Sequence, residues 1–360
     1  MSGSFSSSPL TRRSVLTAGA AIGALAAIPG SASASTGDRA PAIPGVRYRH
    51  VEVDGLRFRL AEAGSGPLVL LLHGFPQTSY AWRHQLVALA RAGFHAVAPD
   101  QRGYPGSAAP SSVLDYSIHH LASDAVGIIN ALGAKNAVLV GHDWGVAVAQ
   151  AVALNRPDLV RGLAALSVPL EPRGDGPPMA ELRAAFGDNF YQLYFLKPGA
   201  AEREFERRTE DVLRKALFHL SGDAPQVSDL IVDSRGLTGS LPLPRRLPRW
   251  LTDKDIQVYA DSFARSGFTG PLNWYRNRDR NWGQTGSWAG ARITQPVLYI
   301  GGDRDPVAYL YGLENLRGVV QAVATDVRSF TVMPGVGHWI PEERPAEVSA
   351  ALTTFAAAVS

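Results

Sequence analysis

The stretch "NAVLVGHDWGVAVAQAVAL" (residues 136–154) places an acid at the tip of a tight turn. An apolar run ends at Val140, Gly141 and Gly145 flank Asp143, and an apolar helical segment follows. This pattern is typical of a nucleophile elbow, in which a sharp turn between a strand and a helix exposes the nucleophile. The alternative is that Asp143 only caps the helix, which is a common use of aspartate.

Short β-rich runs alternate with helical stretches on both sides of this turn. That alternation predicts an α/β fold with a mostly parallel sheet flanked by helices. A hairpin should turn at Asp54 and Gly55. The expected strands lie within "HVEVDGLRFRLAEA" (50–63), "PLVLLLHG" (67–74), "FHAVAPD" (94–100), "NAVLVGH" (136–142), "LAALSVP" (163–169), "PVLYIGG" (296–302) and "SFTVMP" (329–334).

The strand rhythm stops after Pro169 and resumes after residue 291. Between them lie charged helical sequence such as "AEREFERRTEDVLRKALFHL" (201–220) and the Pro-rich "LPLPRRLPRW" (241–250). We therefore expect a helical cap over residues 169–291, inserted into a core domain made of residues 47–168 and 292–360.

The N-terminal segment predicts export. Arg12 and Arg13 precede an apolar stretch from Val15 to Ile28, and the small residues 32–34 follow. This order is typical of a twin-arginine signal peptide over residues 1–34. The apolar stretch is shorter than the roughly 20 residues that span a bilayer. Residues 35–46 read as a linker, and the mature protein is expected to be periplasmic or extracellular.

Composition excludes several function classes. The chain has 360 residues, of which 46% are hydrophobic and none is cysteine, so disulfides and a cysteine nucleophile are excluded. The formal net charge of +3 falls to +1 without the first 34 residues, which carry two arginines and no acid. This balance gives no electrostatic support for binding nucleic acid or a membrane surface.

Three further segments carry candidate groups. The turn "HGFP" (73–76) should aim backbone N–H groups into the site, and the amides of Phe75 and Trp144 are candidates for an oxyanion hole. His338 lies in the Gly-rich loop "PGVGHWIPEERP" (334–345), in the chain order nucleophile, acid, histidine. The acid is Asp303 or Asp305, because both follow the strand "VLYI" (297–300).

From residue 46 to its end the chain resembles the epoxide hydrolases of the α/β-hydrolase fold, soluble branch. Three of the motifs are shared with haloalkane dehalogenases: "HGFP", "GHDWG" and "GHW". Two other segments resemble the cap segments in which epoxide hydrolases carry their ring-opening tyrosines: "FYQLYFLKPG" (190–199) and "SGFTGPLNWYRNRDRNW" (266–282). The resemblance maps these tyrosines to Tyr191 and Tyr275 and the acid to Asp305. It implies substrate contacts from a further set of residues: His73, Pro76, Trp274 and Trp339.

The implied reaction converts a small apolar epoxide and water to a vicinal diol. Asp143 would form an alkyl ester, His338 held by Asp305 would activate water, and no metal or organic cofactor is needed. A haloalkane dehalogenase and a non-catalytic ligand-binding relative are the alternatives, and the expected protein is a monomer or homodimer. Two departures from the family are Gln77-Thr78-Ser79 after "HGFP" and Pro105 in "GYPGS" (103–107).

Overall fold

A computed structural model describes residues 40–239 and 241–360. The predicted signal peptide lies outside the described residues. Export therefore stays a prediction, and a reporter fused to residues 1–40 would test it by its delivery outside the cytoplasm. Residues 40–46, the part of the predicted linker that the structure describes, form no helix or strand.

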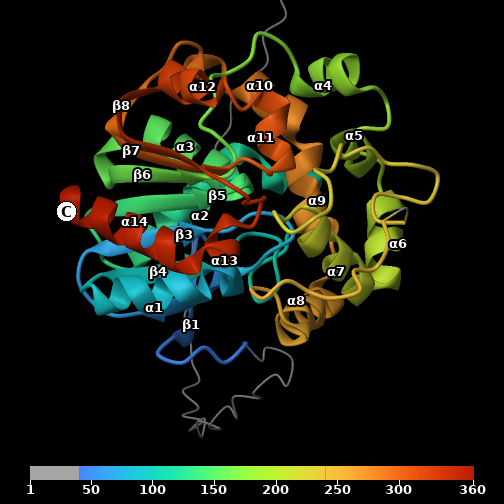
Figure 1. Cartoon of the computed structure of the whole chain (residues 1–360). Helices are drawn as coiled ribbons and strands as arrows, with labels where there is room; N and C mark the ends of the chain where they lie inside the picture. Colours follow the sequence, from blue (N-terminus) through green and yellow to red (C-terminus); the bar gives the residue numbers. More distant parts are fainter. Residues whose placement is uncertain (1–39, 240) are drawn as a thin grey trace, which may run out of the picture. The chain divides into compact units, whose positions relative to one another are not determined.

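The fold centres on an eight-stranded sheet in the order β1-β2-β4-β3-β5-β6-β7-β8 (Figure 1). β1 and β2 form the expected hairpin, β2 pairs antiparallel with β4, and the remaining pairs are parallel. The predicted α/β-hydrolase architecture is confirmed. The strands are β1 (Arg47–Val53), β2 (Leu56–Ala63), β3 (Leu68–Leu72), β4 (His95–Pro99), β5 (Ala137–His142), β6 (Val160–Leu166), β7 (Ile293–Gly302) and β8 (Ala324–Met333).

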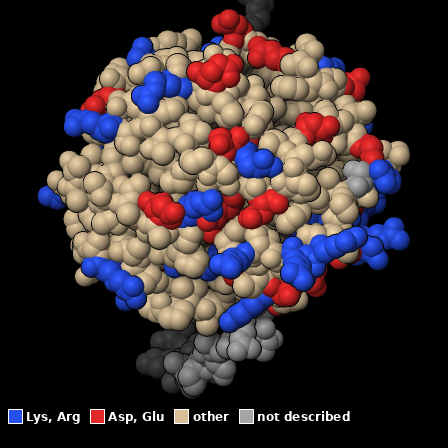
Figure 2. All heavy atoms as spheres, viewed as in Figure 1, with Lys and Arg blue, Asp and Glu red and all other residues tan. Residues whose placement is uncertain are grey.

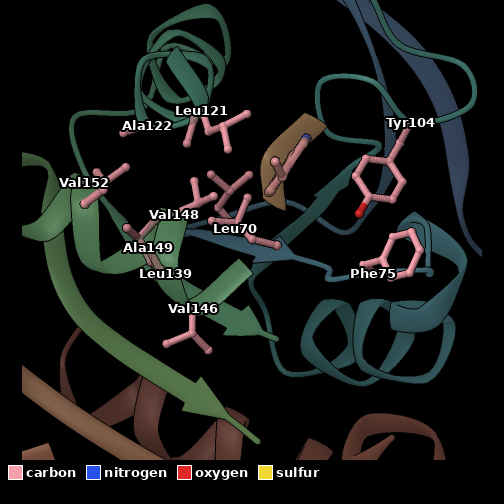
Figure 3. Packing of buried hydrophobic residues seen from close by; sticks show 14 of the residues in the cluster. Leu70, Phe75, Tyr104, Leu121, Ala122, Leu139, Val146, Val148, Ala149 and Val152 are labelled. Carbon is pink, nitrogen blue, oxygen red and sulfur yellow. The ribbon is translucent and has the colours of Figure 1, made fainter. Parts of the chain in front are cut away.

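Alternating side chains of the central strands bury two separate cores. In β3, Leu68, Leu70 and Leu72 join one cluster, while Val69 and Leu71 join the other. This follows from the two-residue period of a strand whose faces are both covered. Helices α2 (Ile118–Ala131) and α3 (Trp144–Asn155) contribute to the first cluster, and α1 (Arg83–Arg91) and α14 (Pro345–Ala358) contribute to the second. Figure 3 shows Leu121 and Val152 of the first cluster beside Leu70 and Leu139.

The described part of the segment between β6 and β7 contains seven α-helices. Figure 1 shows α5 to α9 grouped beside one end of the sheet. His338 donates its backbone N–H to the carbonyl of Leu220 at the end of α7, so this group lies at the carboxyl ends of the strands. The helices of the segment are α4 (Pro178–Phe186), α5 (Tyr191–Phe195), α6 (Ala200–Arg207), α7 (Thr209–His219), α8 (Asp253–Ser266), α9 (Thr269–Arg276) and α10 (Arg278–Gln284).

Short helices complete the described chain. The remaining α-helices are α11 (Pro306–Tyr311), α12 (Leu316–Val323) and α13 (Ile340–Glu343), and the 3₁₀ helices are η1 (Ser79–Trp82), η2 (Val113–Tyr116), η3 (Pro157–Leu159) and η4 (Gly286–Trp288). In the part of the chain that the structure describes, no helix is long and apolar enough to cross a membrane. Acidic and basic side chains are interspersed over most of the face in Figure 2.

Candidate active site

Asp143 occupies the turn between β5 and α3 in a strained backbone conformation. Its φ of 53° lies in the left-handed region, which is rare for residues other than glycine. A Cβ on Gly145 would lie 1.9 Å from the carbonyl oxygen of Leu72, so only glycine allows the turn to approach β3 this closely. The Asp143 side chain forms no capping bond with α3. The helix-cap alternative is therefore excluded as the reason for this residue.

The Asp143 carboxylate instead faces the turn after β3. Its Oδ1 accepts a hydrogen bond of 2.8 Å from the backbone N–H of Phe75. Trp144 starts α3, where amides of the first turn have no acceptor within the helix. Pro76 follows Phe75 through a cis peptide bond and is buried.

His338 lies between two carboxylates on the loop after β8. Its Nε2 is 3.6 Å from Oδ2 of Asp143, and its Nδ1 is 3.1 Å from Oδ1 of Asp305. Asp305 is fully buried. Asp303 instead accepts a hydrogen bond of 2.7 Å from the Gly335 backbone, on the exposed side of the loop. Of the two acids that the sequence leaves open, Asp305 is the one in contact with the imidazole.

The two carboxylates control the charge of the imidazole. Burial opposes a charge on His338, but the negative Asp305 and Asp143 outweigh it and raise the pKa of His338 to about 10. Burial likewise opposes the charge of Asp143, yet His338, His142 and the Phe75 N–H hold the pKa of Asp143 below its ordinary value. Asp143 is therefore an anion paired with an imidazolium at neutral pH.

Ser167 completes this network and was missed by the sequence analysis. It follows β6 with a φ of 71°, and its Oγ is 2.8 Å from Nδ1 of His338 while donating to Oδ2 of Asp305. Tyr299 donates to the Ser167 carbonyl over 2.8 Å. The proton on Nδ1 therefore faces two acceptors, Ser167 Oγ and Asp305 Oδ1. When the imidazole is neutral with its proton on Nδ1, Nε2 is unprotonated and can accept a proton on the side that faces Asp143.

The backbone around His338 is fixed by a second missed residue, Glu343. Its carboxylate accepts hydrogen bonds from the N–H groups of Gly337 and Gly222 (2.9 Å each) and Trp339 (3.0 Å). Burial raises the pKa of Glu343 to about 6, although these three bonds act in the opposite direction. Because Gly222 belongs to the helical segment, one carboxylate ties that segment to the loop that carries His338.

Tyr191 and Tyr275 face the same region from α5 and α9. Their ring centroids are 6.2 Å apart, and Tyr275 lies 5.6 Å from the ring of Phe75 and 5.1 Å from that of Trp144. Burial and the negative Asp143 raise the pKa of both phenols above the ordinary value. Both phenols therefore keep their protons at neutral pH, and each can donate one hydrogen bond.

The other residues expected at the substrate are fully buried. His73 places Nδ1 3.1 Å from the carbonyl of Gly74 and accepts the backbone N–H of Gln101 at Nε2 over 3.2 Å. A hydrogen bond from His73 to a substrate would require one of these bonds to break. Trp274 packs on Trp144 and donates its indole N–H to a backbone carbonyl, whereas Trp339 packs on His338.

The two departures from the family pattern contact protein groups. The side chain of Gln77 donates to Glu342, and the Ser79 N–H donates to Asp100 over 2.8 Å. The Pro105 carbonyl accepts from Arg59 over 3.0 Å. In the described residues, no group of three or more His, Asp and Glu side chains could hold a metal ion.

Comparison with known proteins identifies the family. The family model described as the alpha/beta hydrolase fold matches residues 67–345. Epoxide hydrolase A of Mycobacterium tuberculosis is 43% identical over 313 residues, covering 85% of this chain and 96% of the relative. The chain belongs to the epoxide hydrolases of the α/β-hydrolase fold. Epoxide hydrolase 3 of Siraitia grosvenorii is 39% identical over 86% of this chain and 98% of its own length.

Solved structures agree with this assignment. An epoxide hydrolase from an endophytic Streptomyces superposes on this epoxide hydrolase with a TM-score of 0.83 at 41% identity, covering 87% of this chain and 95% of that one. Epoxide hydrolase A from Mycobacterium thermoresistibile gives a TM-score of 0.80 at 43% identity, covering 86% and 98%. The chain is therefore an enzyme. The two alternatives, a haloalkane dehalogenase and a non-catalytic ligand-binding protein, are not needed to explain these similarities.

The elbow geometry of this epoxide hydrolase predicts that Gly145 is needed for full stability. Gly145→Ala places a methyl group against the Leu72 carbonyl, so β3 and the turn must move apart. We expect a loss of about 3 kcal/mol or more in the free energy of unfolding. Gly283→Ala is the control, because a Cβ there meets no atom within 4 Å and alanine favours the helix. Equal denaturation midpoints for the two variants would contradict the argument.

Proposed function

We propose that this epoxide hydrolase opens its substrate through a covalent ester on Asp143. The observation that carries the proposal is the buried Asp143 carboxylate, with the Phe75 N–H on one oxygen and His338 beside the other. An epoxide presents a strained, saturated carbon, where a carboxylate can act as a nucleophile. The Asp143 oxygen forms a bond to that carbon, the ring C–O bond breaks, and its electron pair stays on the epoxide oxygen.

Tyr191 and Tyr275 supply the proton that this oxygen needs. An alkoxide is strongly basic, and a neutral phenol within reach can donate to it as the ring opens. The protonated state of both phenols supports this role, with Tyr275 buried and Tyr191 partly buried. A departing halide would need no such donor, so the paired phenols favour an epoxide as substrate.

Water then hydrolyses the ester with His338 as the base. His338 takes a proton from water, the hydroxide oxygen adds to the Asp143 carbonyl carbon, and the amides of Phe75 and Trp144 stabilise the oxyanion. The intermediate collapses, and His338 returns its proton to the diol oxygen that leaves. The regenerated Asp143 carboxyl group loses a proton that restores the tyrosine. Epoxide and water thus become a vicinal diol.

Ester formation also prepares His338 for this step. The raised pKa of His338 depends on the negative charges of Asp305 and Asp143. Alkylation removes the charge of Asp143 and leaves that of Asp305. The pKa of the imidazole therefore falls when the ester forms, and the imidazolium releases its proton to solvent. The neutral form can then accept a proton from water, and His338 takes a proton from solvent again after the Asp143 carboxylate is regenerated.

The surroundings of the site favour a small apolar epoxide. The ring of Phe75 packs 5.5 Å from Phe195, which packs 4.9 Å from Tyr275. Such aromatic walls with a few directed polar groups are typical of sites for apolar ligands. Water is the second substrate.

His338→Gln tests the division of labour between the two steps. Alkylation needs no base, whereas ester hydrolysis does, so we expect the variant to accumulate an alkyl-enzyme. Mass spectrometry should find one added epoxide on the peptide that contains Asp143. The matched control is His338→Gln combined with Asp143→Asn, which should carry no adduct. An adduct on another residue would contradict the proposal.

The rate of ester hydrolysis should rise with pH in the wild-type enzyme. Below its pKa His338 is charged and cannot accept a proton, and in the ester that pKa lies below the value of about 10 in the free enzyme. Asp305→Asn removes a further negative charge, so the rise should move to lower pH and the plateau should drop. Single-turnover decay of the ester measures this rate. Independence of pH across the titration of His338 would refute its role as base.

Replacing the tyrosines should slow ester formation and leave ester hydrolysis unchanged. Tyr191→Phe and Tyr275→Phe should each slow the first step, and the double variant should lose on the order of 10²-fold. Tyr194→Phe is the control on the same helix, because its hydroxyl donates to Glu204 over 2.9 Å. Rapid-quench measurement of the alkyl-enzyme separates the two steps. If the double variant formed the alkyl-enzyme at the wild-type rate, the assignment of the two tyrosines as proton donors would be refuted.

A further inference from the structure

A short chain of hydrogen bonds leads away from the Tyr191 hydroxyl. The amide nitrogen of Gln192 donates to the Tyr191 oxygen over 2.9 Å, and the guanidinium of Arg278 donates to the amide oxygen of Gln192 over 2.8 Å. Gln192 is 6% exposed, and Arg278 is half-buried at the start of α10. The guanidinium also lies over the Trp144 ring, 6.0 Å from its centroid.

Arg278 decides which way the Gln192 amide points. A guanidinium has only donors, so it can satisfy the amide oxygen but never the amide nitrogen. With its oxygen toward Arg278, Gln192 must turn its nitrogen toward Tyr191. The tyrosine oxygen therefore accepts a hydrogen bond here, and its single proton is left for another partner.

Removing the guanidinium would free the amide to rotate. The oxygen of Gln192 could then face Tyr191 and accept the phenol proton, which is the proton that the opening ring needs. The positive charge of Arg278 and the bond from Gln192 also oppose the rise in the pKa of Tyr191 that burial and Asp143 cause. Tyr275 has an equivalent donor in the side chain of Trp144.

We propose that Arg278 and Gln192 are positioning residues that keep the Tyr191 proton directed at the epoxide oxygen. The inference rests on the proposed role of Tyr191 in ring opening. Neither residue needs to touch the substrate. No ion pair between described residues joins Arg278 to a carboxylate, and its guanidinium donates to the Gln192 oxygen over 2.8 Å.

Arg278→Met tests the arginine through the rate of alkyl-enzyme formation in single turnovers. We expect a loss of about 10-fold, because one of two donors loses its orientation. Arg278→Lys, which keeps a donor-only cation, should recover most of the rate. Arg280→Met is the matched control, since Arg280 lies on the same helix and donates to the Leu114 carbonyl over 2.8 Å. An unchanged rate in Arg278→Met would overturn the proposal.

A double-mutant cycle shows whether the arginine acts through Tyr191. Arg278→Met should have no further effect in a Tyr191→Phe background and its full effect in a Tyr275→Phe background. An equal loss in both backgrounds would mean that Arg278 acts by another route. If Tyr191→Phe alone formed the alkyl-enzyme at the wild-type rate, the proposed role of Tyr191 itself would be refuted. A failure of the proposal for Arg278 can therefore be distinguished from a failure of the proposal for Tyr191.

Gln192→Glu separates orientation from packing. Its side chain has nearly the same shape and retains the contact with Arg278, so a purely structural role predicts an unchanged rate and an equal or higher melting temperature. The proposal predicts slow alkylation, near that of Tyr191→Phe, because a carboxylate accepts the phenol proton and donates none. Wild-type alkylation by a folded Gln192→Glu enzyme would overturn it.

Discussion

A buried carboxylate that must stay ionised is the constraint on which this site depends. Taking a charge out of water costs several kcal/mol unless it is paired and hydrogen-bonded. Asp143 meets this cost with the Phe75 amide and the His338 imidazolium. Holding these groups around one carboxylate requires the elbow, and the elbow requires Gly145 against the Leu72 carbonyl. β3, β5 and the loop after β8 must therefore lie where they bring these groups to the same carboxylate.

The helical segment between β6 and β7 is joined to the chemistry at several points. Leu220 and Gly222 bond to the loop of His338, directly and through Glu343, while Tyr191 and Tyr275 come from helices of the same segment. A displacement of these helices would therefore move the base and both phenols together. In the proposed mechanism, this linkage aligns the groups of both steps.

The fold was predictable from the sequence because its central strands, such as β3 and β5, are nearly continuous apolar runs bounded by turns. Asp143 and His338 were predictable for a related reason, since each lies in a glycine-rich turn at the end of such a run. The choice between Asp303 and Asp305 was open to the pattern alone, because both follow β7 and only the path of the loop brings one of them to His338. The family resemblance pointed to Asp305, which is the acid that contacts His338.

The supporting residues could not be found in this way. Ser167 meets Asp305 across 138 residues of sequence, Gly222 meets Glu343 across 121, and Gln192 meets Arg278 across 86. Such pairs depend on how distant segments pack, and serine, glutamate, glutamine and arginine are common on any surface. Conversely, His73 looked like a substrate contact, yet its ring nitrogens bond to the backbone and hold the turn.

The source of the diol oxygen tests the covalent account most directly. Enzyme in excess over epoxide, in water enriched in heavy oxygen, should release mostly unlabelled diol in the first turnover, because the new oxygen comes from the Asp143 carboxylate. The label should then appear in the Asp143 side chain, and later turnovers should release labelled diol. Fully labelled diol from the first turnover would mean that water attacks the epoxide directly and that Asp143 is not the nucleophile.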